Sequence, residues 1–117
     1  MKILLVDDEE KFVSRLAERL ELRGFDADWT TTCDEAIFKA ETEKYDVAVL
    51  DVKMPRMSGL EIKKRMKQIA PDMKFIFVTG HGSEEDYDIG TKEGSSYIIK
   101  PFKIETLVEK IEQALNI

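Results

Sequence analysis

The sequence has very few of the residues that build covalent or thiolate frameworks in small proteins. It contains one cysteine, Cys33, and one histidine, His81, among 117 residues. A lone cysteine excludes a disulfide within the chain and a thiolate metal cluster, and it fits a reducing compartment. Zinc is also disfavoured, because its usual sites combine several histidine and cysteine ligands.

Long apolar runs and an excess of basic residues are missing as well. The apolar run near the amino terminus, Ile3–Val6, is too short for the core of a signal peptide or for a membrane span. The 24 acidic residues outnumber the 18 basic ones, and the net charge of −6 argues against direct binding of nucleic acid or an anionic membrane. We therefore expect a cytoplasmic protein without a nucleic-acid or membrane partner of its own.

The size and composition fit one folded domain over residues 1–117. The 43% hydrophobic content is enough for a core without disulfides or a structural metal. The three prolines and six glycines do not gather into a linker, and no repeat or low-complexity segment is present. Met1 directly precedes the first predicted strand, and Asn116-Ile117 resembles a natural end, so we slightly favour a stand-alone domain over one excised from a larger regulator.

Three unbroken apolar runs predict strands that are buried on both faces of a parallel sheet. They are Ile3–Val6, Val47–Leu50 and Phe75–Val78. Shorter signals at Asp26–Thr30 and Tyr97–Ile99 bring the number of predicted strands to five. Helical patterns follow each strand, from Phe12 to Gly24, from Thr32 past Ala40, from Gly59 to Ile69, weakly after Ser83, and from Ile104 to Leu115. This alternation predicts a doubly wound α/β fold with five helices.

Polar side chains follow four of these strands at the point where each one ends. They are Asp7-Asp8, Asp51, Thr79 and Lys100. The carboxyl ends of parallel strands lie at one edge of the sheet, where ligands bind in open α/β folds. Two carboxylates about 4 Å apart repel by roughly 4 kcal/mol at an effective dielectric constant near 20, so three of them need protons or a cation.

Mg²⁺ is the cation that suits a small set of oxygen ligands. A site of acids and Mg²⁺, faced by the ammonium of Lys100 and the hydroxyl of Thr79, suits a phosphoryl group. A carboxylate can then act as the nucleophile and form an acyl phosphate, and the centrally placed Asp51 is the candidate. Each residue also has a plain interpretation, such as a turn residue, a strand threonine or a surface ion pair, but five strand-end positions together favour the phosphoryl site.

The same residues resemble a known family. Asp7-Asp8, Asp51 followed by Met54-Pro55 and Gly59, Thr79-Gly80, and Lys100-Pro101-Phe102 match, in that order, the receiver domain of two-component response regulators, of the chemotaxis-regulator kind. The resemblance covers essentially the whole chain. It implies a flavodoxin-like fold with strand order 2-1-3-4-5, and a signalling phosphoprotein.

The resemblance also implies a role for each acid of the site. Asp51 would be the phosphoacceptor. Asp8 and Asp51 would hold Mg²⁺ directly, together with the backbone carbonyl of Lys53, and Asp7 would act mainly through a metal-bound water. Lys100 would pair with the phosphoryl group.

Three further features follow from the same resemblance. The bond between Lys100 and Pro101 would be cis. Thr79 would be the switch hydroxyl, and Tyr97 would be the aromatic residue that changes rotamer with it. Phosphorylation would then change the surface formed by the fourth helix, the fifth strand and the fifth helix.

The partners that the resemblance implies are proteins. The phosphoryl group would come from the phosphohistidine of a sensor histidine kinase or of a phosphotransfer protein. A downstream protein target or a fused output domain would respond, and a homodimer that forms on phosphorylation is a further candidate. The domain would catalyse its own phosphorylation and dephosphorylation without being a conventional enzyme.

Two residues beside the site lie where the family varies. Lys53 stands two residues after Asp51, and His81 stands two residues after Thr79. We expect their side chains to screen the attacking water and so to set the lifetime of the aspartyl phosphate. The plain alternative is that both side chains are only solvated.

Other functions fit the residues less well. A phosphatase of the haloacid dehalogenase type also uses an aspartate nucleophile, but it needs a second acid where this chain has Lys53. A nucleotide or flavin module is weakly indicated, because Gly80-His81-Gly82 has no third glycine at the required place. A degenerate receiver that only scaffolds partners is disfavoured, because all five site positions are present.

Overall fold

The computed structural model describes residues 1–80 and 96–117. Five strands form one sheet, and the neighbouring strands that pair are parallel, in the order β2-β1-β3-β4-β5. The strands are Lys2–Val6 (β1), Asp26–Thr30 (β2), Val47–Asp51 (β3), Lys74–Thr79 (β4) and Ser96–Ile99 (β5). The predicted doubly wound, flavodoxin-like fold with strand order 2-1-3-4-5 is therefore confirmed.

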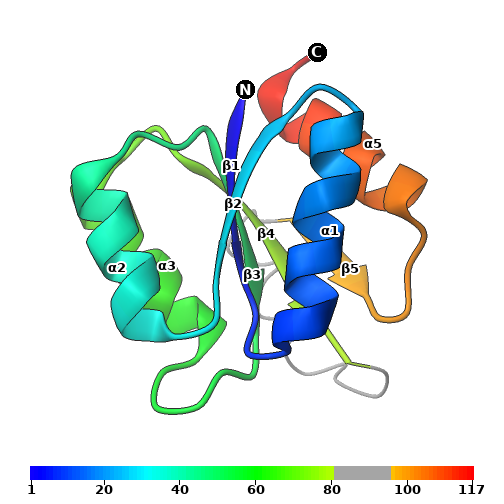
Figure 1. The fold of residues 1–117 in the computed structure, drawn as a ribbon. Helices are drawn as coiled ribbons and strands as arrows, with labels where there is room; N and C mark the ends of the chain where they lie inside the picture. Colours follow the sequence, from blue (N-terminus) through cyan, green and yellow to red (C-terminus); the bar gives the residue numbers. More distant parts are fainter. Residues whose placement is uncertain (81–95) are drawn as a thin grey trace.

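Four helices within the described residues cover the two faces of the sheet (Figure 1). One face carries α1 and α5, and the other carries α2 and α3. The helices are Glu10–Leu22 (α1), Cys33–Thr42 (α2), Gly59–Ile69 (α3) and Ile104–Leu115 (α5). The helix predicted after Ser83 lies outside the described residues.

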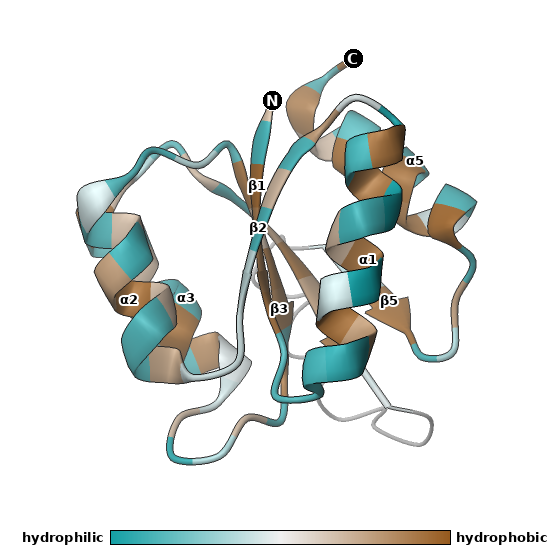
Figure 2. Cartoon of the chain, viewed as in Figure 1, coloured by the Kyte–Doolittle hydropathy of each residue, from teal (hydrophilic) through white to brown (hydrophobic). Residues whose placement is uncertain are grey.

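The central strand β3 is buried on both faces, as its unbroken apolar run predicted. All five of its residues are buried. Successive side chains point to opposite faces, so Ala48 and Leu50 enter the core beneath α2 and α3, while Val47 and Val49 enter the core beneath α1 and α5. The hydrophobic strands between helices of mixed hydropathy are visible in Figure 2.

Side-chain caps begin two of the helices. The hydroxyl of Thr32 accepts a hydrogen bond from the backbone N–H of Glu35 at 3.2 Å at the start of α2. Ser58 does the same for Glu61 at the start of α3, also at 3.2 Å. Ser58-Gly59-Leu60-Glu61 and Thr32-Cys33-Asp34-Glu35 share the sequence form of a capping box.

Candidate functional site: a carboxylate cluster at the sheet edge

The candidate site lies at the carboxyl ends of β1, β3, β4 and β5, which meet at the lower edge of the sheet in Figure 1. The crossover connections bring residues far apart in sequence to this edge. They include the predicted residues Asp7, Asp8, Asp51, Thr79 and Lys100, which follow or end these strands. The sequence-based placement of these residues at strand ends is confirmed.

The three acids form a compact cluster of oxygen atoms. Asp7, Asp8 and Asp51 each offer a carboxylate oxygen, and these atoms lie within 4.8 Å of one another. Asp7 and Asp51 are buried, with 4% and 9% of their surface exposed, while Asp8 is exposed. The cluster therefore has a dry inner part and an open outer side. An all-oxygen set of this size fits Mg²⁺, which retains several waters when it binds to proteins.

Asp51 is the acid whose charge the site disfavours most clearly. Burial raises its pKa to about 6, and the neighbouring charge of Asp7 adds to this effect. Lys100 and the backbone N–H of Lys53 act in the opposite direction, and the N–H donates to Asp51 Oδ1 at 3.2 Å. A cation bound among these acids would relieve the repulsion, which is the physical reason to expect a metal here.

Lys100 enters the cluster from the end of β5. Its Nζ lies 2.7 Å from Asp7 Oδ2 and 3.0 Å from Glu9 Oε1, and it stands 4.4 Å from the centre of the Phe12 ring. Burial alone would lower the pKa of Lys100, but the hydrogen bonds to Asp7 and Glu9 raise it overall. The ammonium of Lys100 therefore remains charged. The peptide bond between Lys100 and Pro101 is cis, as expected.

Thr79 and Tyr97 lie on the neighbouring strands β4 and β5. Thr79 is buried at the end of β4, and its hydroxyl donates to the Gly80 carbonyl at a long 3.5 Å. The backbone N–H of Lys100 donates to the Thr79 carbonyl at 2.8 Å, which ties the two site residues together. Tyr97 is buried, and its ring lies 5.4 Å from that of Phe77, its partner in the register of β4 and β5.

Lys53 and His81 were predicted to face the attacking water. The backbone of Lys53 contacts Asp51, and its side chain is exposed. His81 lies outside the described residues. Glu9 and Phe12, which contact Lys100, were not predicted as site residues. Glu9 at the N-cap of α1 and Phe12 within it carried only helix signals in the sequence. Their contact with Lys100 could not be read from a local pattern, because Lys100 is about 90 residues away.

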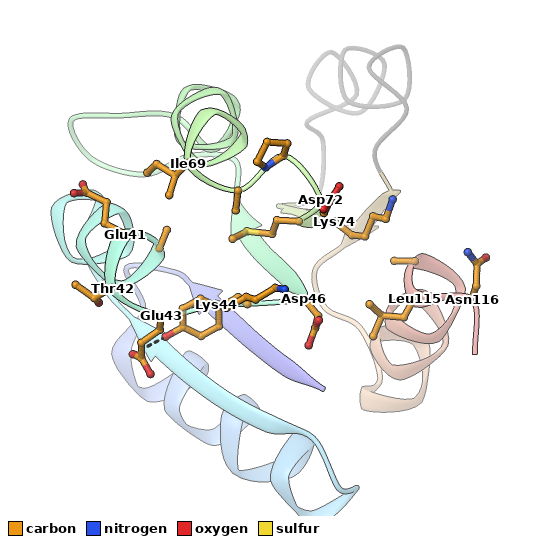
Figure 3. A pocket seen from close by; sticks show the side chains of 16 residues that line it. Glu41, Thr42, Glu43, Lys44, Asp46, Ile69, Asp72, Lys74, Leu115 and Asn116 are labelled. Carbon is orange, nitrogen blue, oxygen red and sulfur yellow. Dashed lines mark hydrogen bonds between the residues drawn. The ribbon is translucent and has the colours of Figure 1, made fainter.

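A separate pocket lies at the opposite edge of the sheet (Figure 3). It has a volume of about 550 Å³ and is lined by the segments before β3 and β4 and by the end of α5. Its polar lining includes Glu43, Lys44, Asp46 and Lys74. Because these residues stand at the amino ends of the strands, the pocket is not part of the carboxylate cluster.

Comparison with known proteins identifies the family. Residues 3–112 match the response regulator receiver domain family. The chain belongs to this family. The receiver domain is 36% identical over 116 residues to the alkaline phosphatase synthesis transcriptional regulatory protein PhoP of Bacillus subtilis, covering 98% of this chain and 48% of that protein. It is also 36% identical over 118 residues to the transcriptional regulatory protein RprY of Bacteroides fragilis, covering 99% of this chain and 50% of that protein.

The receiver domain thus spans about half the length of these two relatives. Two solved structures share its fold along most of both chains. A receiver domain protein from Methanospirillum hungatei JF-1 superposes with a TM-score of 0.89 at 34% identity, covering 98% of this chain and 93% of that one. A response regulator from Burkholderia pseudomallei has a TM-score of 0.83 at 28% identity, covering 98% and 74%. The latter was solved with a phosphorylated aspartic acid, a calcium ion and citrate.

Family membership supports the receiver interpretation over the phosphatase and nucleotide-binding alternatives. The acidic cluster of Asp7, Asp8 and Asp51 is consistent with a phosphorylation site that can bind a metal. Receiver domains of response regulators pair with histidine kinases. Within residues 1–80 and 96–117, no helix has the length and apolar character needed to cross a membrane.

Proposed function

We propose that this receiver domain accepts a phosphoryl group on Asp51 from the phosphohistidine of a sensor histidine kinase or a phosphotransfer protein. The observation that carries the proposal is the buried Asp51 carboxylate at the end of β3, clustered with two other acids and facing the charged Lys100. A carboxylate in this setting is held in place, partly dry and close to a cation. These are the conditions that favour its use as a nucleophile.

The transfer of the phosphoryl group forms one bond to phosphorus and breaks another. A carboxylate oxygen of Asp51 attacks phosphorus, the bond from phosphorus to the histidine nitrogen breaks, and its electron pair remains on the imidazole. Asp8, Asp51 and the carbonyl of Lys53 would hold Mg²⁺, with Asp7 acting through water, and the bound metal would neutralise charge on the phosphoryl oxygens. The backbone N–H of Lys53 orients the Asp51 carboxylate, and Lys100 offers positive charge to the transferred group.

The response begins with Thr79 and Tyr97. Within residues 1–80 and 96–117, the hydroxyl of Thr79 donates one long hydrogen bond, to the Gly80 carbonyl, and a phosphoryl oxygen on Asp51 is a better acceptor for it. Its movement toward Asp51 would leave space that the Tyr97 ring can enter. Because Tyr97 packs on Phe77 at the edge of the sheet, this change alters the surface around β5 and α5.

The output is a protein partner, an output domain on the same chain, or a homodimer that forms on phosphorylation. The two relatives named above are transcriptional regulators of about twice this length. Their names support control of transcription as the output of a longer protein that contains residues 1–117 as its receiver domain. A stand-alone domain that acts through protein contacts is the alternative.

Intact mass measurement tests the phosphoacceptor directly. Incubation with acetyl phosphate and Mg²⁺ should add one phosphoryl group, about 80 Da, to the protein. The Asp51→Asn variant should gain nothing, whereas Asp72→Asn, which changes an exposed aspartate outside the cluster, should react like the original chain. The reaction should stop when a chelator removes Mg²⁺.

Failure of the original chain to accept a phosphoryl group would favour the alternative of a receiver that only scaffolds its partners. If the original chain gains no mass, and beryllofluoride with Mg²⁺ does not bind to it either, Asp51 is not a phosphoacceptor. Partner binding that is equal for the original chain and Asp51→Asn would then identify a receiver that acts without phosphorylation.

A further inference from the structure

The ammonium of Lys100 is held by the first turn of α1 as well as by the carboxylate cluster. Glu9 occupies the N-cap position of that helix without a side-chain capping bond, and its Oε1 lies 3.0 Å from Lys100 Nζ. The ring of Phe12, in the same turn, lies 4.4 Å from Nζ and makes a cation–π contact with it. Phe102 packs edge-on against Phe12 at 5.9 Å and supports the ring.

Glu9 contacts the cluster in two separate ways. Its backbone N–H donates to Asp7 Oδ1 at 2.9 Å, while Asp7 Oδ2 accepts from Lys100 Nζ at 2.7 Å. Its side chain independently accepts from Lys100. A change of the Glu9 side chain therefore leaves the backbone bond that orients Asp7 in place, and Glu9→Gln removes only the negative charge that faces Lys100.

The close contacts of Lys100 go to Asp7 and Glu9, whereas Asp51 influences it only through a longer-range charge interaction. A phosphoryl group on Asp51 would offer the ammonium a more strongly charged partner than Glu9. We propose that Glu9 is a positioning residue that competes with the phosphoryl group for Lys100 and so restrains phosphorylation. This inference rests on the proposed function of Asp51 as phosphoacceptor.

The exposure of the two side chains sets the size of the restraint. The Glu9 side chain is 65% exposed and that of Lys100 is 19% exposed. An ion pair with one partner so open to water is weak, which corresponds to roughly a two- to fivefold effect on an equilibrium or rate. The contact is therefore strong enough to bias Lys100 and weak enough to be exchanged on each phosphorylation.

The test is the rate of phosphorylation of Glu9→Gln by acetyl phosphate with Mg²⁺. In this reaction an Asp51 oxygen bonds to phosphorus while the bond from phosphorus to acetate breaks, and acetate leaves with the electron pair. Glu9→Gln should be phosphorylated roughly two- to fivefold faster than the original chain. Its dephosphorylation rate should not change, because Lys100 has already left Glu9 in the phosphorylated protein.

Glu10→Gln is the matched control, because it removes the same charge one residue further along the same turn. Glu10 is exposed, and within the described residues no hydrogen bond or ion pair involves its side chain. Glu10→Gln therefore measures how the loss of one negative charge changes the rate of reaction with an anionic phosphodonor. In a Lys100→Ala background, Glu9→Gln should accelerate the reaction no more than Glu10→Gln does, since the competition needs Lys100.

A second readout does not depend on phosphorylation. In the metal-free protein, the NMR signals of the Lys100 ε-methylene group should shift in Glu9→Gln and remain in place in Glu10→Gln. Unchanged signals, or equal phosphorylation rates for Glu9→Gln and Glu10→Gln, would overturn the restraint while Asp51 still gains its phosphoryl group. If the original chain gains none, the phosphoacceptor proposal fails first, and the inference fails with it.

Discussion

Gly59 lies so close to Asp51 that no larger residue fits there without a backbone shift. A β-carbon on Gly59 would stand 2.6 Å from the carbonyl oxygen of Asp51 and 3.0 Å from the α-carbon of Val52. The backbone N–H of Gly59 also donates to the Val52 carbonyl at 2.9 Å, which closes the loop between β3 and α3. The glycine therefore allows the first turn of α3 to pack directly on the strand end that carries Asp51.

Gly59→Ala should destabilise the fold and slow phosphorylation together. The added methyl group must push backbone atoms apart, and we expect a loss of roughly 1–3 kcal/mol in the free energy of unfolding. Urea denaturation measures this loss, and the rate with acetyl phosphate measures the effect on Asp51. Gly80→Ala is the control, because a β-carbon there meets no described atom within 4 Å. Equal stability of the two variants would show that the strand end tolerates the shift.

Asp51→Asn should stabilise the metal-free protein at neutral pH. The pKa of Asp51 is about 6 in the folded state, above its ordinary value of 3.8. A raised folded-state pKa gives stability that is present below pH 4 and is lost as the pH rises through 6. The neutral asparagine avoids this loss, so we expect a gain of roughly 1–3 kcal/mol at pH 7.5.

Denaturation in urea with a chelator present measures this gain, and Asp72→Asn serves as the control for the removal of one negative charge. The difference between Asp51→Asn and the original chain should shrink below pH 5, where Asp51 is already protonated in the folded protein. A gain that is the same at pH 7.5 and pH 4 would contradict the assigned cause.

Mg²⁺ binding should weaken as the pH falls through 6. A carboxylate must lose its proton to bind a metal, and the raised pKa of Asp51 places that step near pH 6. We expect roughly tenfold weaker binding at pH 5 than at pH 7.5, together with a lower melting temperature when a chelator removes the metal. Calorimetric titration at both pH values tests this, and equal affinities would exclude Asp51 as a ligand.

Lys53→Ala should shorten the lifetime of the aspartyl phosphate. The backbone of Lys53 contacts Asp51 while its side chain remains exposed, so the side chain can screen the acyl phosphate from water without holding the carboxylate. The rate of mass loss after removal of the phosphodonor measures hydrolysis. We expect His81→Ala to shorten the lifetime of the aspartyl phosphate as well. Lys44→Ala is the control, because Lys44 lines the pocket at the opposite edge of the sheet. Unchanged rates in both variants would show that these side chains are only solvated.

Local patterns in the sequence predicted most of the fold. The strand at Asp26–Thr30 is confirmed although its sequence signal was short. It lies at the edge of the sheet, and only Ala27 and Thr30 of its five residues are buried. The boundaries were less accurate where backbone pairing decides them. β4 begins at the polar Lys74 because that residue pairs with Val47 across the sheet, and hydropathy does not report such pairing.

Local sequence patterns were enough to specify which residues reach the functional edge. Apolar runs that end in Asp7, Asp51, Thr79 and Lys100 place those residues at the carboxyl ends of parallel strands, whatever the details of packing. The tertiary structure alone decided how they meet. Lys100 turns toward Asp7 and Glu9, and Gly59 packs on Asp51, because these contacts join segments that are distant in sequence or depend on ångström-scale approach. No local pattern carries that information, since it arises only when the strands and helices have packed.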